Sequence, residues 1–106
     1  MTTEKGIKLD NGKNRLGLVF KGFSNALWQV GEVGTFGANK YTDNGWQEVK
    51  NGIKRYTSAL LRHLFKHFQG EVYDKESGLL HLSHVAWNAL AILELYSPKE
   101  VKQNDR

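Results

Sequence analysis

The chain has 106 residues, 40% of them hydrophobic, with a formal net charge of +4 and no cysteine. This length suits one domain with a core of its own, and the composition is that of a folded chain rather than a disordered one. Without cysteine, a disulfide framework and a thiolate metal site are both excluded.

Charge and hydropathy narrow the choice of partners. The charged amino terminus lacks the apolar core of a signal peptide. The longest apolar stretch, 85–96, is too short for a membrane span and contains Asn88 and Glu94. We therefore expect a cytoplasmic protein that does not contact membranes. The positive charge favours an anionic partner such as a nucleotide or a nucleic acid, although many small proteins without such a partner are also basic.

Residues 1–23 are rich in glycine, lysine and asparagine and contain one short apolar run at 16–20. Glycines interrupt and follow this run, which indicates a short strand or an extended segment. We predict an amino-terminal arm over 1–23 that packs on the domain or on a neighbouring subunit.

A first helix is predicted to begin at Ser24 or Asn25, because either side chain can accept hydrogen bonds from the free N–H groups of an opening turn. It should stop in the glycine-rich segment that follows. Each glycine inside a helix costs about 1 kcal/mol relative to alanine. A series at every third position therefore indicates close approach of another helix or of a ligand, and it comprises Gly31, Gly34 and Gly37.

The segment 40–46 combines a turn signal, TDNG, with Lys40, Tyr41 and Trp46. Aromatic side chains beside a lysine can stack on a base and contact a phosphate. The alternative is that Trp46 anchors the loop to the core.

Two further helices are predicted, one from Ile53 to Phe68, stopped by Gly70, and one from Leu79 to Tyr96. Ser77 can cap the last helix. This helix is apolar nearly all round and should be the central, most buried one, with a polar stripe that consists of His81, His84 and Asn88.

The predicted architecture is all-α, a small bundle of about three helices with an extended amino-terminal arm. It divides into the arm at 1–23, a helical nucleotide-binding domain at 24–97 and a polar tail at 98–106. A bundle of this size with an apolar central helix has surface left to cover, so we expect a homo-oligomer.

The stretch 62–84 holds all four histidines. Glu71, Asp74 and Glu76 are hard oxygen ligands that suit Mg²⁺ or Mn²⁺. His81 and His84, one helical turn apart, could complete a softer site for Mn, Co or Zn. The basic residues Arg62 and Lys66 could hold a phosphate chain. The alternatives are a solvated acidic loop and histidines satisfied within the core.

Four segments resemble, in order and spacing, the phage-associated dATP/dGTP diphosphohydrolase amino-terminal domain family. They are GTFGANKYTDNGW at 34–46, RYTSALLRHL at 55–64, GEVYDKESG at 70–78 and HLSHVAWNALAILEL at 81–95. The resemblance implies hydrolysis of purine deoxynucleoside triphosphates to monophosphate and pyrophosphate, with Mg²⁺ or Mn²⁺ as cofactor. The metal ligands would be Glu71, Asp74, Glu76 and His81.

Catalytic and substrate-binding roles are also predicted for residues within the matching segments. The catalytic group would comprise Glu71, Asp74, His63 and His84. The substrate-binding group would comprise Lys40, Tyr41, Asn44, Trp46, Arg55, Arg62 and Asn88.

Two other functions compete with hydrolysis. One is a phage protein that binds nucleotides or signal nucleotides without turnover. The other is a small nucleic-acid-binding protein, which is disfavoured because the basic residues are scattered and the acidic loop would repel a phosphate backbone.

Overall fold

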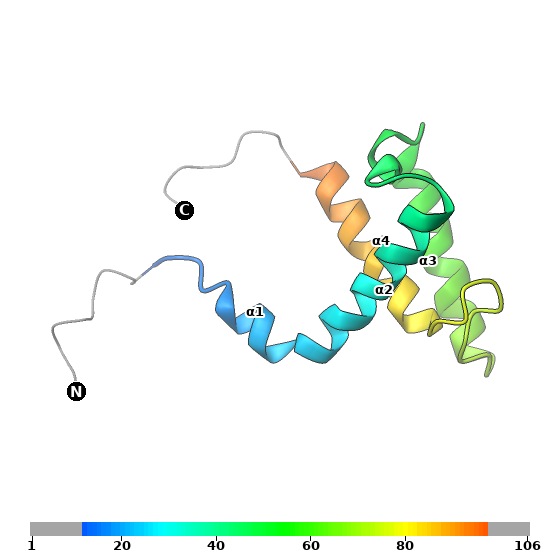
Figure 1. The fold of residues 1–106 in the computed structure, drawn as a ribbon, viewed down its shortest axis with the longest axis horizontal. Helices are drawn as coiled ribbons and strands as arrows, with labels where there is room; N and C mark the ends of the chain where they lie inside the picture. The colour runs from blue at the N-terminus through cyan, green and yellow to red at the C-terminus, as the bar shows by residue number, and fades with distance from the viewer. Residues whose placement is uncertain (1–11, 98–106) are drawn as a thin grey trace, which may run out of the picture.

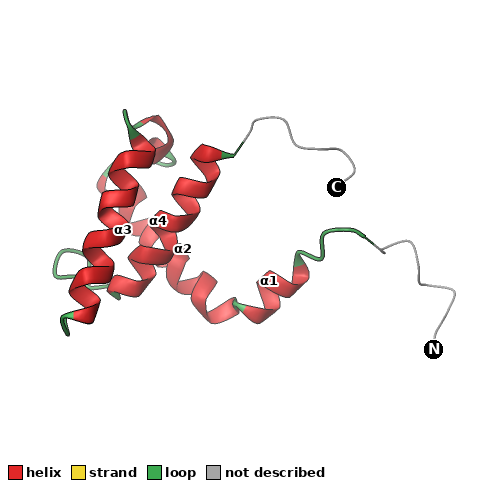
Figure 2. Ribbon diagram, turned by 180° about the vertical axis from the view of Figure 1, so that it is seen from behind, coloured by secondary structure: helices red, strands yellow, loops and turns green. Residues whose placement is uncertain are grey.

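The computed structural model describes residues 12–97, and these fold into helices joined by short loops (Figures 1 and 2). In chain order the elements are α1 (Gly17–Gly22), α2 (Ser24–Lys40), the 3₁₀ turn η2 (Gly45–Glu48), α3 (Gly52–Phe68) and α4 (His81–Tyr96). The described residues contain no β-strand, and extended pairing is limited to one isolated bridge between Tyr73 and Leu80. The prediction of an all-α fold is confirmed.

Helix α4 is central, because it packs against α3 along its length and also against α2. Its buried side chains, however, are mostly polar: His81, Ser83, His84 and Asn88 are buried together with Ala91. Leucines on the same helix, such as Leu90 and Leu93, stay exposed. The central position was predicted correctly, but the apolar sides of the helix are not the buried ones within this chain.

The segment 16–20, expected to be extended or a strand, instead leads into helix α1, so this prediction was wrong. The apolar positions Leu16, Val19, Phe20 and Phe23 follow the i, i+3, i+4, i+7 spacing of one helix face. None of the four is buried against the rest of the chain. Only Phe23 separates α1 from α2, and α1 with the start of α2 extends away from the bundle, whereas the later part of α2 packs on α4 (Figure 1).

The starts of two helices differ from the prediction. Neither Ser24 nor Asn25 caps α2, because the carbonyl of Phe23 accepts from Leu27 N–H and the chain passes directly from one helix into the next. Ser77 does not cap α4 either, since that helix begins beyond Leu80 without a side-chain cap.

Two glycines lie against side chains of α4, and only the second is too tightly packed to accept a Cβ easily. A Cβ on Gly34 would lie 3.5 Å from the indole nitrogen of Trp87, whereas Gly31 and Gly37 have nothing within 4 Å. Close approach therefore holds for one glycine of the predicted series. At the start of α3, a Cβ on Gly52 would come within 3.0 Å of Leu95, so this buried glycine brings α3 against the end of α4.

Candidate functional site

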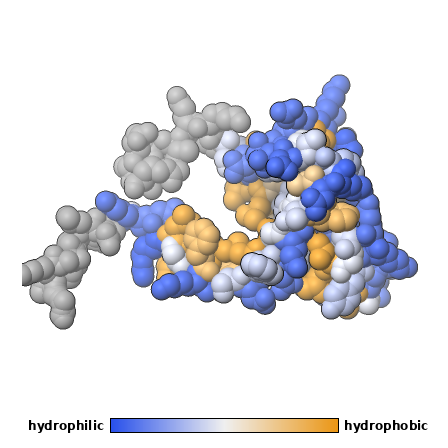
Figure 3. Space-filling view, in the orientation of Figure 1, coloured by the Kyte–Doolittle hydropathy of each residue, from blue (hydrophilic) through white to orange (hydrophobic). Residues whose placement is uncertain are grey.

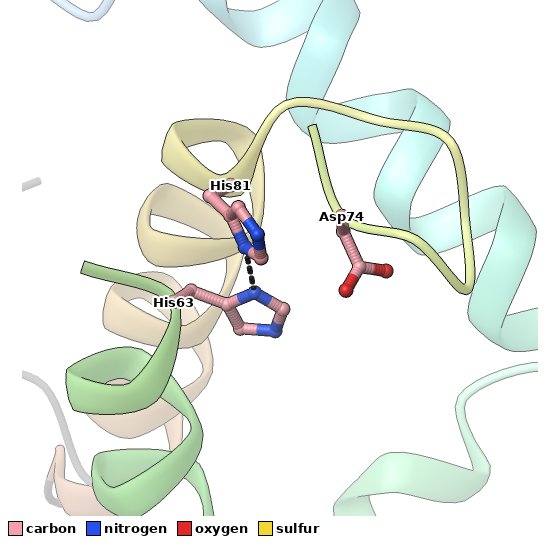
Figure 4. A group of neighbouring side chains, drawn as sticks. All are labelled: His63, Asp74 and His81. Atoms are coloured by element: carbon pink, nitrogen blue, oxygen red, sulfur yellow. Dashed lines mark hydrogen bonds between the residues drawn. The ribbon is translucent and has the colours of Figure 1, made fainter. Parts of the chain in front are cut away.

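Three side chains from separate segments converge where α3 ends and α4 begins. His63 comes from α3, His81 opens α4, and Asp74 projects from the loop between them (Figure 4). One ligand atom of each lies within 4.8 Å of the others. Two imidazoles and a carboxylate at this separation form a possible binding site for a metal ion.

The loop that carries Asp74 is held closed by its own hydrogen bonds. Its carboxylate accepts from the backbone N–H of Ser77 at 2.9 Å and from the Ser77 hydroxyl at 2.8 Å. The Asp74 N–H donates to the Leu79 carbonyl, and Gly78 N–H donates back to the Asp74 carbonyl, both at 2.8 Å. The positive φ of Gly78, 75°, allows this turn. The sequence DKESG thus fixes the aspartate beside the helix pair.

His81 is completely buried and is held on both ring nitrogens. Its Nε2 lies 2.9 Å from a carboxylate oxygen of Glu71, and its Nδ1 lies 2.7 Å from Nδ1 of His63. The hydrogen bond from His81, with the charges of nearby lysines, lowers the pKa of Glu71. An ionised carboxylate only accepts, so Nε2 of His81 carries the proton and Nδ1 presents a lone pair toward His63.

His84 lies flat against His63, with ring centroids 4.3 Å apart and planes inclined by 7°. Its Nε2 is 2.7 Å from the hydroxyl of Ser77. Because that hydroxyl already donates its one proton to Asp74, Nε2–H of His84 is the donor and its Nδ1 is the free acceptor. The edge of Phe36 from α2 closes this side, with ring centroids 6.5 Å apart.

Burial keeps the imidazoles of His63 and His84 neutral. It lowers the pKa of His63 to about 4, helped by the proximity of His84. Burial also lowers the pKa of His84, against the opposing effect of the Asp74 charge. For Asp74 itself burial acts to raise the pKa, but the two hydrogen bonds from Ser77 and the neighbouring histidines bring it below its ordinary value. At neutral pH the rings of His63 and His84 are therefore uncharged and lie beside ionised carboxylates.

His67 lies one turn after His63 on α3. Its buried Nδ1 has no hydrogen-bond partner among residues 12–97. The ring instead packs edge-on against Phe68.

Comparison with known proteins identifies the chain. The family model described as "dATP/dGTP diphosphohydrolase, N-terminal" matches residues 3–106. The chain belongs to this family. A "dATP/dGTP diphosphohydrolase" of Salmonella phage PMBT28 is 32% identical over 101 residues, which are 95% of this chain and 33% of that protein. The chain thus spans about a third of the length of the relative it matches. No solved structure matches it.

The four metal ligands predicted for this family member do not meet at one point. Asp74 and His81 do lie together, with His63 as the third group. Glu71 is on the far side of the His81 ring, bound to Nε2. Glu76 forms an ion pair with Lys40, and its side chain is 60% exposed.

The residues predicted to bind substrate are dispersed. Lys40 and Tyr41 lie at the end of α2, with the ammonium 5.3 Å from the exposed Tyr41 ring. Arg55 and Arg62 are exposed on α3, and Arg62 directly precedes His63. Buried Asn88 donates to the carbonyl of His84 and so acts within α4.

The loop aromatic Trp46 belongs to an edge-to-face cluster. Its ring centroid is 5.3 Å from that of Trp87 and 6.1 Å from that of Tyr56. Tyr56 also donates its hydroxyl proton to the Trp46 carbonyl at 2.7 Å. The preceding Asn44 adopts a left-handed conformation, φ 55°, that starts η2. These positions match the alternative in which Trp46 anchors the loop.

Sequence reasoning missed Ser77 as part of the site and assigned it to a helix cap. The signal was its position three residues after Asp74, the spacing at which an aspartate accepts from the backbone in a turn. No helix within 12–97 is long and apolar enough to cross a bilayer.

Proposed function

We propose that this chain binds a purine deoxynucleoside triphosphate and, with Mg²⁺ or Mn²⁺, hydrolyses it to the monophosphate and pyrophosphate. The observation that carries the proposal is the convergence of His63, Asp74 and His81 within a chain that belongs to the family. In the reaction, a water oxygen bonds to the α-phosphorus. The bond from that phosphorus to the bridging oxygen of the β-phosphate breaks, and the water loses a proton.

His63, Asp74 and His81 would hold the metal ion, because their donor atoms are the ones that converge. When bound, such an ion neutralises phosphate charge and makes a coordinated water more acidic. Glu71 would act through His81 by fixing the orientation of its ring.

His84 is the proposed proton acceptor. Its ring is neutral at pH 7 because burial lowers its pKa, and its Nε2 is engaged with Ser77. The Nδ1 lone pair is therefore the position that can take a proton from water. The stacked His63 ring and the Phe36 edge keep the imidazole in place.

Exposed basic side chains near the three converging residues would hold the phosphates. Arg62 and Lys66 lie on α3 at the level of the cluster and are exposed. Lys40 is held near the loop by its ion pair with Glu76, which raises the pKa of Lys40 and keeps the ammonium charged. Exposed Tyr41 is available to stack on a base.

Binding without turnover is the second candidate. It is favoured by one observation, the exposed Tyr41 ring with the Lys40 ammonium 5.3 Å from it, because these two groups can contact a nucleotide without any help from the histidines. The same cations and Tyr41 would then serve a protein that sequesters nucleotides. Such a protein would bind the ligand unchanged and without a requirement for metal.

A mass-resolved assay separates the two functions. Each dNTP is incubated with the protein in Mg²⁺, in Mn²⁺ and in EDTA, and both soluble products and bound nucleotide are measured. We expect monophosphate and pyrophosphate from dATP and dGTP, abolished by EDTA and reduced at least about 100-fold by Asp74→Asn. Retention of unchanged nucleotide on the protein would favour binding without turnover. If the assay shows no product and no bound nucleotide, both candidate functions are overturned.

A further inference from the structure

We propose that His63, Asp74 and His81 form a site for a first-row transition-metal ion such as Mn²⁺, Co²⁺ or Zn²⁺, with Glu71 as an outer support. This differs from a Mg²⁺ site built from the loop carboxylates. The inference deepens the proposed function, because it concerns the same cluster, and it states which ion the donors select.

The spacing of the two imidazoles fits adjacent positions around one ion. Their Nδ1 atoms are 2.7 Å apart (Figure 4). Two nitrogens bound to one metal at about 2.1 Å, at right angles, lie about 3 Å apart. Without metal, one proton between these two nitrogens makes a hydrogen bond, and a metal cation can displace that proton and bind both nitrogens. The Asp74 carboxylate, directed toward the same point, supplies a third donor and a negative charge.

The contact between Glu71 and His81 supports this assignment independently. Metal-bound histidines commonly donate their other ring N–H to a carboxylate, which fixes the tautomer and strengthens the ligand. Here Nε2 of His81 lies 2.9 Å from Glu71, so Nδ1 is kept unprotonated on the side of the cluster. The ring is 0% exposed, and it is therefore held in one orientation by both its partners and its surroundings.

The chemistry of the donors selects the class of ion. Mg²⁺ prefers oxygen ligands and several waters, whereas imidazole suits Mn²⁺, Co²⁺, Zn²⁺ and similar ions. Two of the three converging groups are imidazoles. The other loop carboxylates are engaged elsewhere, Glu71 with His81 and Glu76 with Lys40. Two histidines and one carboxylate leave further coordination positions for water or phosphate oxygen.

Metal binding to the EDTA-stripped full chain tests the inference directly. Mn²⁺ is titrated by loss of the free-ion electron paramagnetic resonance signal, and Co²⁺ by its visible absorption. We expect one ion per chain, with ¹⁴N couplings from two imidazoles in the bound Mn²⁺ spectrum. An excess of Mg²⁺ over Mn²⁺ of at least about 100-fold should be needed to displace it. The nitrogen couplings need no variant, so they stay informative even if a substitution unfolds the protein.

Matched variants identify the ligands. We expect His63→Gln and Asp74→Asn each to weaken Mn²⁺ binding by about 100-fold or more, and Glu71→Gln to weaken it about 10- to 100-fold. Glu76→Gln, a carboxylate of the same loop, and Glu94→Gln, an exposed carboxylate on α4, should leave Mn²⁺ binding unchanged. Circular dichroism of each variant confirms that it is folded.

The outcomes separate this inference from the proposed function. Tight Mn²⁺ binding with nitrogen couplings but no dNTP hydrolysis would support the site and overturn the function. Hydrolysis with Mg²⁺ alone, unaffected by His63→Gln and without nitrogen couplings, would overturn the site and its ligands but support dNTP hydrolysis as the reaction. Loss of Mn²⁺ binding in Glu76→Gln together with full binding in His63→Gln would also overturn the site and return the metal to the loop carboxylates.

Discussion

The junction of α3 and α4 and the segment formed by α1 with the start of α2 distribute their side chains in opposite ways. At the junction the buried groups are polar, with His81 at 0% exposure. In the second segment hydrophobic residues lie on the surface (Figure 3). Phe20 is 62% exposed and Trp28 is 75% exposed. Burial of polar groups is costly unless every one is paired, and exposure of large apolar groups is costly unless something covers them.

This difference between the two regions indicates which of them is held in place by contacts within the chain. Apart from Nδ1 of His67, the junction pairs its buried polar atoms internally, through Glu71, Ser77 and the other histidines, and so can hold a site in a fixed geometry. The α1 segment shows a helical apolar face with no buried residue. Its stabilisation among residues 12–97 is therefore local, and none of these residues buries the apolar face.

The largest effect is expected when His81, at the junction, is compared with its neighbour Leu82, which is 45% exposed. His81→Ala removes a buried ring and leaves both Glu71 and His63 without their partner, so we expect a loss of about 3 kcal/mol in the free energy of unfolding. Leu82→Ala should cost less than about 1 kcal/mol. Urea unfolding in EDTA measures both. A greater loss for the leucine would contradict the view that the polar contacts organise this region.

Acid should destabilise the metal-free junction in a defined order. Burial lowers the pKa of His63 from 6.5 to about 4, so between these values the unfolded chain binds a proton that the folded chain does not. Stability is therefore full above about pH 6.5 and is lost as the pH falls toward 4. Because the ring is partly exposed, we expect a loss of about 2 kcal/mol rather than the full linkage value.

Carboxylates extend the loss to lower pH. The pKa values of Glu71 and Asp74 are lowered in the folded chain, so their contribution is present above the ordinary carboxyl range and is lost as the pH falls through it. Chemical denaturation at a series of pH values in EDTA, with NMR titration of the His63 ring, tests this sequence. Constant stability from pH 7 to pH 4.5 would contradict it.

The smallest effect on the fold is expected in α1. The homo-oligomer anticipated from the sequence stays a proposal, with a second copy of the chain covering the apolar face of α1. Replacing Phe20 and Phe23 by serine should change the unfolding free energy at low protein concentration by less than about 0.5 kcal/mol, because neither ring is buried. The same change should lower the sedimentation coefficient at high concentration.

Lys21→Ser is the matched control for the oligomer, since it alters an exposed residue of the same helix without removing apolar surface. Sedimentation of the control should equal that of the unchanged chain. A monomeric unchanged chain at all concentrations would remove the second copy as the covering partner.

The sequence determined much of this protein through local rules. Apolar residues at helical spacing specified α3 and α4 to within two residues of their ends, and Gly70, with φ 99°, stops α3 where predicted. The clustering of histidines and carboxylates in 62–84 located the candidate site. At 16–23 the same helical spacing was present but was obscured by two glycines, which is why α1 was not predicted.

Tertiary structure decided which atoms meet. Spacing along the chain cannot tell whether Glu71 faces a metal or the outer nitrogen of His81, because both arrangements use the same loop. It cannot bring His63 to His81, eighteen residues away, before α3 has packed on α4. Periodicity fixes the face of a helix that a residue occupies, whereas the direction and partner of a polar side chain depend on the neighbouring element that supplies its hydrogen bond.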